Sequence, residues 1–174
     1  ILMVVGDLDL DKKFDVFSNR VERIGFVPIK RLPELILCVD INIAPLEIDN
    51  PFCLAKSALK YFEAGILGVP TVASATGDFI RCMRKGENGF VAKTDAEWCE
   101  YLTRLIHDKG LRESIGKAAQ MDSLKNHVSS GYAVENDFIS QIRGFVADAE
   151  MVSGRVLEES NTKKKRISII TPGI

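Results

Sequence analysis

The chain has 174 residues, of which 46% are hydrophobic and 27% are charged, and its net charge is −1. This composition is that of a globular domain, and it excludes a disordered chain and the strongly basic surface of a dedicated nucleic-acid-binding protein. No apolar run reaches the roughly 18 residues that span a membrane. The chain begins at Ile1 without an initiator Met or a basic leader, so we expect a piece of a longer protein with no signal peptide.

Short apolar runs alternate with helical patterns along the first part of the chain. The sequence predicts strands at 1–5, 21–27, 39–44, 71–74 and 90–92, and helices at 31–37, 52–67 and 78–84. The strands are continuous apolar runs without polar alternation, which is typical of strands buried on both faces. Strands separated by helices therefore predict an α/β fold, a Rossmann-like parallel sheet with helices on both faces.

The helical patterns continue beyond the last of these strands. Thr94 and Glu97 form a capping box, which predicts the start of a helix whose inner face includes Trp98. A second helix follows at 111–119, and a terminal helix is predicted at 132–151.

The end of the chain changes character. Residues 158–166 are charged or polar and contain no apolar residue, which predicts a linker, and 167–174 read as a strand closed by a turn. We expect a domain at 1–157, a linker at 158–166 and the truncated start of a following domain at 167–174. The alternative is that this last segment belongs to the first domain.

The cysteines and histidines do not indicate a metal site. Four cysteines stand at 38, 53, 82 and 99, too far apart for a CxxC clip, and the chain has only two histidines. We expect reduced thiols in a cytoplasmic protein, and no metal cofactor.

The most informative segment is 45–74, which reads as strand end, loop, helix and strand. In open parallel sheets, ligands bind beyond the carboxyl ends of the strands, against helix N-termini. On a continuous helix, Lys56, Lys60 and Glu63 fall within roughly 60° of one another. Because the helix dipole disfavours cations at this end, the stripe predicts a bound diphosphate, with Glu63 accepting hydrogen bonds from ribose. The alternative is a solvated face in which Lys60 and Glu63 form an ordinary pair.

Several motifs in combination resemble a known family. KSALKYFEAGILGVPTVAS, GENGFVAKTDAEW and the later LR..IGKAA pattern are similar to the C-terminal, donor-binding domain of GT-B glycosyltransferases, family 4-like or group 1, of the bacterial polysaccharide biosynthesis type. The resemblance covers roughly residues 1–120. It implies one half of a GT-B fold, in an enzyme that transfers a sugar from a nucleotide-diphosphate-sugar to a glycan or lipid-linked acceptor.

The resemblance also implies site residues. Glu63 matches the second glutamate of the family's Glu-x7-Glu pattern, which contacts ribose, whereas Ala55 stands in place of the first. We predict Lys56 and Glu63 as the catalytic residues, with Lys56 and Lys60 stabilising the departing diphosphate in place of a metal. The predicted donor-binding residues are Glu47, Asn50, Ser57, Lys60, Gly25 and Val27.

The implied partners are the nucleotide-sugar donor and an acceptor held by a missing N-terminal domain, with peripheral membrane association of the full protein and no nucleic acid. We expect the domain alone to be inactive, because it lacks the acceptor half. Ala55 keeps a second hypothesis open, a non-catalytic nucleotide-sugar-binding or scaffold domain. A receiver-type regulatory domain is disfavoured, because Asp40 lies inside its predicted strand rather than at its end.

Overall fold

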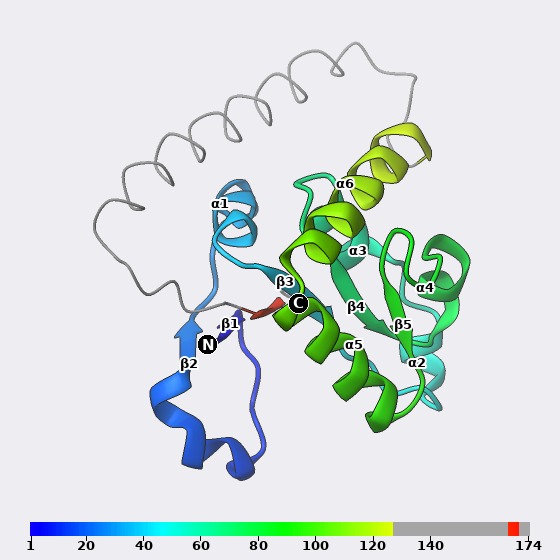
Figure 1. The fold of residues 1–174 in the computed structure, drawn as a ribbon. Coiled ribbons are helices and arrows are strands. Elements are labelled where there is room, and N and C mark those ends of the chain that lie inside the picture. The colour runs from blue at the N-terminus through cyan, green and yellow to red at the C-terminus, as the bar shows by residue number, and fades with distance from the viewer. Residues whose placement is uncertain (127–166, 171–174) are drawn as a thin grey trace, which may run out of the picture.

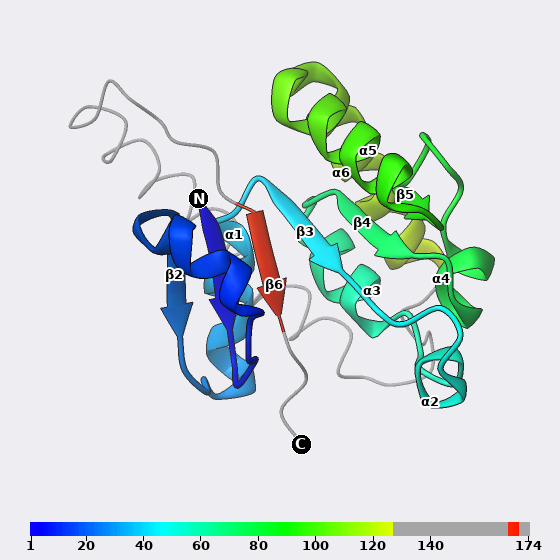
Figure 2. The same cartoon turned by 90° about the horizontal axis from the view of Figure 1, so that it is seen from below.

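The computed structural model describes residues 1–126 and 167–170, which form a parallel sheet with the strand order β2-β1-β6-β3-β4-β5 (Figures 1 and 2). The strands are β1 (Leu2–Val5), β2 (Val21–Ile24), β3 (Ile41–Ala44), β4 (Thr71–Ser74), β5 (Phe90–Ala92) and β6 (Ile167–Ile170). The helices are η1 (Lys12–Arg20) and η2 (Ile29–Arg31), both 3₁₀, and α1 (Leu32–Leu37), α2 (Pro51–Leu54), α3 (Leu59–Gly65), α4 (Gly77–Cys82), α5 (Asp95–His107) and α6 (Lys109–Asn126).

Apolar side chains pack on both faces of the sheet, as the uninterrupted apolar strands predict. On one face, Met3 and Val5 of β1 pack in a cluster with Ile36 of α1 and Ala64 of α3. Figure 2 shows α1 and α3 behind the strands.

A second cluster joins three strands to α5 and α6. Its buried members are Ile41, Val72, Phe90, Ala92, Tyr101, Leu105 and Ile115. Trp98 of α5 packs against this cluster and is half-buried. The predicted Rossmann-like fold class is therefore confirmed, with parallel strands covered by helices.

The last described strand pairs within this sheet. Ile167–Ile170 form β6, which pairs in parallel with both β1 and β3. That 167–174 begin a further domain stays a prediction. Between two strands, both backbone edges of β6 find hydrogen-bond partners that a lone strand would lack. The predicted linker at 158–166 and the predicted helix at 132–151 lie outside the described residues.

The helix expected at 52–67 is divided in two. Helix α2 ends at Leu54 and α3 begins at Leu59, so that residues 55–58 link two short helices. The prediction of one continuous helix is therefore wrong, and the angular argument that placed Lys56 on a common stripe with Lys60 and Glu63 does not hold. The same angular argument still applies within α3, to Lys60 and Glu63.

None of the helices in the described part of the chain is both long and apolar enough to cross a membrane.

Candidate functional site

All the strands are parallel, so their carboxyl ends meet at one edge of the sheet (Figure 2). The chain leaves β1 at Gly6, whose φ of 99° favours glycine, and the Gly6 N–H donates to the Ile24 carbonyl at 2.9 Å. Gly25 follows β2, and a Cβ added there would meet no atom within 4 Å. Among the described residues there is therefore space for a side chain at Gly25, on the edge where open parallel sheets bind their ligands.

The loop after β3 is held by side-chain hydrogen bonds. The Leu46 N–H donates to Ser74 Oγ at 2.7 Å, which ties the loop to the end of β4. Asn50 Nδ2 donates to Glu47 Oε2 at 2.7 Å, and Asn50 Oδ1 accepts from the Phe52 N–H at 2.9 Å. Asn50 is thus the N-cap of α2.

Lys56 lies in the link between α2 and α3. Its Nζ is 4.8 Å from the centroid of the Phe52 ring, a cation–π contact, and the Phe52 side chain is exposed. Ser57, the next residue, is also exposed. Lys56 is half-buried and precedes α3, so it is not on the helix itself.

Lys60 and Glu63 are paired on α3. Lys60 Nζ donates to Glu63 Oε2 at 2.9 Å, and the two side chains are only 17% and 20% exposed. This is the i, i+3 pair that the sequence leaves as the alternative to a phosphate-binding stripe. Asn42 Nδ2 of β3 donates to the Lys60 carbonyl at 3.2 Å and holds this part of α3 on the sheet.

The structure brings some of the predicted site residues together and not others. It joins Lys60 to Glu63 and Glu47 to Asn50. Val27 packs against the cluster of buried residues that contains Met3, Ile36 and Ala64. Lys56 contacts Phe52, and among the described residues no hydrogen bond or ion pair links Lys56 to Lys60 or Glu63.

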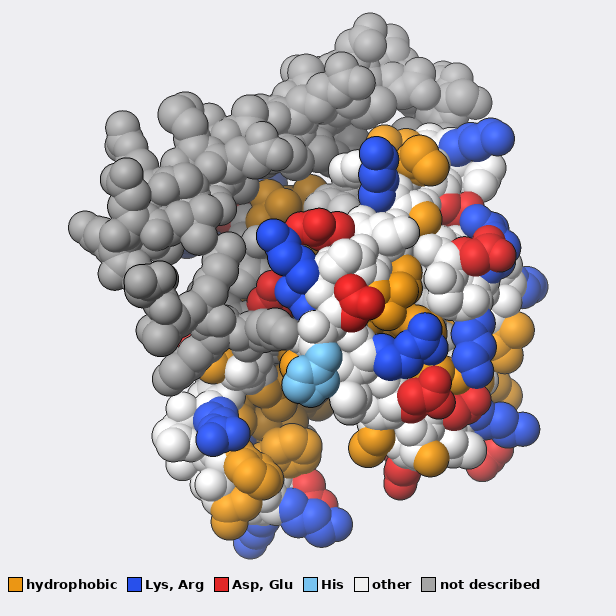
Figure 3. Space-filling model, viewed as in Figure 1, with side chains coloured by type: hydrophobic (Ala, Val, Ile, Leu, Met, Phe, Trp, Pro, Cys, Tyr) orange, Lys and Arg blue, Asp and Glu red, His pale blue; other side chains and the backbone are white. Residues whose placement is uncertain are grey.

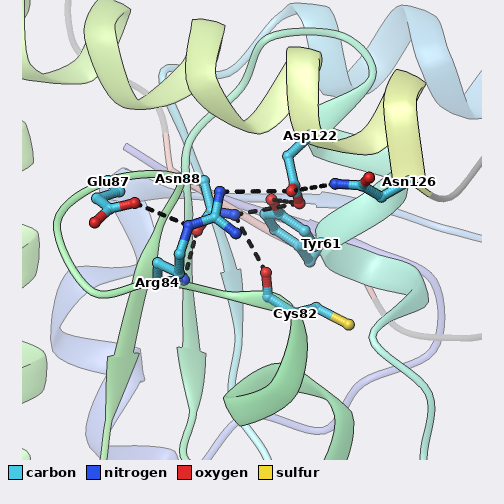
Figure 4. A network of polar contacts seen from close by, with 7 residues as sticks. All are labelled: Tyr61, Cys82, Arg84, Glu87, Asn88, Asp122 and Asn126. Carbon is cyan, nitrogen blue, oxygen red and sulfur yellow. Dashed lines mark hydrogen bonds and ion pairs between the residues drawn. The ribbon is translucent and has the colours of Figure 1, made fainter.

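A buried polar network behind α3 has no counterpart in the sequence predictions (Figure 4). Tyr61 Oη donates to Asp122 Oδ2 at 2.9 Å, and Asn88 Nδ2 donates to the same oxygen at 3.2 Å. Asn126 Nδ2 donates to Asp122 Oδ1 at 2.9 Å, and Arg84 approaches that oxygen at 3.5 Å. The network ties α3 to α6 and to the turn before β5.

Burial raises the pKa of Tyr61 well above its ordinary value, and the hydrogen bond to Asp122 raises it further. One sequence signal for this network was available. Asp122 follows the inward-facing Ala119 by three residues, so a helical projection places a carboxylate on the buried side of α6. A buried carboxylate needs donors, and the chain supplies them from segments far away in sequence.

The charges on the surface are mixed. On the face drawn in Figure 3, Lys and Arg side chains are interspersed with Asp and Glu, without one uniformly basic area. Within 1–126 and 167–170, no group of three or more His, Cys, Asp or Glu residues is placed to hold a metal ion. The independence from metal remains a prediction.

Residues 1–108 match the family described as Glycosyl transferases group 1. The chain belongs to this family. The comparison with curated proteins returned no match.

Solved structures agree in fold. Anabaena HepE in complex with UDP and glucose is 19% identical with a TM-score of 0.60, covering 91% of this chain and 40% of that chain. Sucrose-phosphate synthase from Thermosynechococcus elongatus is 16% identical with a TM-score of 0.59, covering 91% of this chain and 39% of that one. The C-terminal domain of the group 1 glycosyl transferase LpcC from Francisella tularensis is 20% identical with a TM-score of 0.53, covering 66% and 57%.

At these identities the likeness is one of fold, and it confirms the predicted Rossmann-like half of a GT-B fold. The chain spans about 40% of the length of HepE and of sucrose-phosphate synthase.

Proposed function

We propose that this chain is the donor-binding domain of a glycosyltransferase, which holds a nucleotide-diphosphate-sugar at the carboxyl edge of its sheet. Membership of the group 1 family is the observation that carries the proposal. The structures of HepE with UDP and with UDP-glucose support a uridine nucleotide as the first ligand to test. The space at Gly25 after β2 and the Glu63 side chain of α3 supply the proposed place for it.

In the proposed site, Glu63 accepts hydrogen bonds from the ribose hydroxyls, and the loop at Gly25 and Val27 borders the base. Lys56 and Ser57 come just before α3, where the diphosphate would lie. As the bond to the sugar breaks, negative charge grows on the diphosphate, and a positioned ammonium stabilises it. Glu47 and Asn50 lie on the loop after β3, from which they would contact the sugar.

The rest of the reaction depends on the remainder of the protein. We propose a glycan or lipid-linked acceptor, bound by a part of the enzyme outside this chain, as in polysaccharide biosynthesis. We also propose a cytoplasmic location, peripheral membrane association of the full protein, and catalysis without a metal because lysine carries the countercharge.

A non-catalytic nucleotide-sugar-binding domain is the second candidate. Ala55 favours it, because this residue stands at the C-cap of α2 where the family pattern has its first glutamate. Incubating the intact protein with UDP-sugars separates the two candidates. Transfer or hydrolysis of any of them supports the enzyme, and binding without turnover supports the second candidate.

The donor site itself is tested by calorimetric titration of the chain with UDP and with uridine. Lys56→Ala should weaken UDP binding by about 1.5–3 kcal/mol, the value of a hydrogen bond to a charged group, and uridine binding far less. Glu63→Gln should weaken the binding of both UDP and uridine, because both contain ribose. Lys117→Ala is the control, since Lys117 is exposed on α6. Unchanged UDP affinity in a folded Lys56→Ala protein contradicts the assignment of Lys56.

A further inference from the structure

The ion pair on α3 is more enclosed than an ordinary surface pair. Lys60 and Glu63 retain 17% and 20% of their side-chain exposure, whereas the pair between Lys109 and Glu113 on α6 retains 78% and 67%. Exposed pairs are screened by water and contribute little. A half-buried pair is screened less, so that removing one partner leaves the other charge poorly compensated.

Within the described part of the chain, the Glu63 carboxylate has one hydrogen-bond partner. Its Oε2 accepts from Lys60 Nζ at 2.9 Å, and no other hydrogen bond reaches Glu63 from residues 1–126 or 167–170. A carboxylate has about four acceptor positions, so Oε1 and one lone pair of Oε2 remain for a ligand. Two neighbouring hydroxyls, such as those of a ribose, match that remaining capacity.

The backbone beneath the pair is fixed from two sides. Asn42 of β3 donates to the Lys60 carbonyl at 3.2 Å, and the neighbouring Tyr61 donates to Asp122 of α6 at 2.9 Å. The Lys60 side chain therefore starts from an anchored point, and its ammonium is directed to Glu63. Lys56, in contrast, lies on the link, where its ammonium contacts the exposed Phe52 ring.

We propose that Lys60 is a positioning residue, which orients the Glu63 carboxylate for a ribose diol and does not contact the diphosphate. The proposal rests on the proposed function, since it concerns the same donor site. It gives the two lysines different roles. Lys56 contacts the phosphates, whereas Lys60 affects nucleoside binding by orienting the Glu63 carboxylate. The sequence predicts that both lysines bind the nucleotide-sugar donor. The proposal keeps direct contact with the donor for Lys56 alone.

Titration of Lys60→Met and Lys60→Arg with UDP and with uridine tests this division. Lys60→Met should weaken both ligands by the same factor, about tenfold, as expected for an interaction with a charged group. The ratio of the UDP and uridine affinities should stay that of the unchanged chain. Lys60→Arg should restore both affinities, because a guanidinium can also reach a carboxylate one turn away. Lys109→Met, on the exposed pair of α6, is the matched control.

A double variant excludes a merely structural role. If Lys60 acts through Glu63, Lys60→Met combined with Glu63→Gln should bind uridine no more weakly than Glu63→Gln alone. If Lys60 contacted a phosphate, Lys60→Met would instead weaken the binding of UDP more than that of uridine. If Lys60 and Glu63 acted independently, the losses of uridine affinity in the two single variants would add in the double variant. Either result, or unchanged affinities in Lys60→Met, overturns the proposal. If the unchanged chain binds neither UDP nor uridine, the proposed function itself fails and this inference fails with it.

Discussion

Asp122 is the buried carboxylate on which three separate segments converge. It accepts from Tyr61 of α3, from Asn88 of the turn before β5 and from Asn126 on its own helix (Figure 4). A desolvated carboxylate is stable only when its oxygens accept hydrogen bonds, and the buried donors likewise need an acceptor. Removing either side would therefore leave the other without a hydrogen-bond partner. The network therefore fixes the back of the helix that carries Lys60 and Glu63.

Asp122→Ala should reduce the free energy of unfolding by about 3–5 kcal/mol, since it leaves the Tyr61 hydroxyl and the Asn88 amide without a buried acceptor. Urea unfolding followed by circular dichroism measures this loss. Glu113→Ala, at an exposed position of the same helix, should change stability by less than about 0.5 kcal/mol. Equal effects of the two variants would show that the network contributes little.

Tyr61 gives the network a pH dependence. Burial, and then the hydrogen bond to Asp122, raises the pKa of Tyr61 above its ordinary value of 10.0. Above about pH 10, the unfolded chain loses the phenolic proton while the folded chain keeps it, so stability falls as the pH rises. The unfolding free energy of Tyr61→Phe should fall less steeply over that range. Urea unfolding between about pH 9 and about pH 11 compares the slopes, and parallel slopes would contradict the assignment.

At the scale of the element, the capping box at the start of α5 is a prediction that needs only local sequence. Thr94 Oγ1 accepts from the Glu97 N–H at 3.2 Å, and Glu97 Oε2 accepts from the Lys93 N–H at 2.7 Å. That backbone hydrogen bond is also the main reason why the pKa of Glu97 is lowered. The capping box is confirmed because all of its partners lie within four residues of one another.

Thr94→Ala should reduce the free energy of unfolding by about 1 kcal/mol, because the N–H of Glu97 loses its acceptor. Thr103→Ala is the matched control, since Thr103 lies exposed within the same helix and has no capping role. Thermal and urea unfolding of both variants measures the difference. A Thr103→Ala protein that is destabilised as much as Thr94→Ala would remove the cap as the explanation.

The division between α2 and α3 needed information from another element. No glycine or proline lies between 55 and 58, and the apolar spacing continues through them, so the sequence predicts one helix. In the structure, the Leu54 carbonyl lies against Gly77 at the start of α4, so close that a Cβ there would clash. A contact between residues this far apart overrides local helical preference, and no local pattern reveals it.

The candidate site was predictable to the same limited extent. The pairing of Lys60 with Glu63 joins residues three apart, and the sequence leaves it as the alternative to a diphosphate-binding stripe. The position of Lys56 depends on where the helix breaks, and the sequence does not predict that break. Tyr61 and Asp122 meet across 61 residues of sequence, so their contact follows only from the packing of α3 on α6.

At the scale of the whole molecule, the centre of the sheet shows most clearly that local sequence does not specify contacts between distant segments. The apolar run at 167–170 predicts a strand, and a strand is found, but an apolar run does not specify its neighbours. In the structure β6 separates β1 from β3, with the Ile167 N–H donating to the Ile1 carbonyl at 2.9 Å. Both halves of the sheet therefore depend on this strand for their backbone pairing.

A pair of truncations tests that dependence. Ending the chain at Arg166 removes β6 and leaves the facing edges of β1 and β3 without their ladder partners. At about 1 kcal/mol for each net hydrogen bond, the loss should be several kcal/mol and should lower the midpoint of thermal unfolding markedly. Ending the chain at Ile170 keeps β6 and should leave the midpoint unchanged. If both truncated chains melt like the full chain, then 167–174 contribute nothing to this sheet, and this result would support their prediction as the start of a following domain.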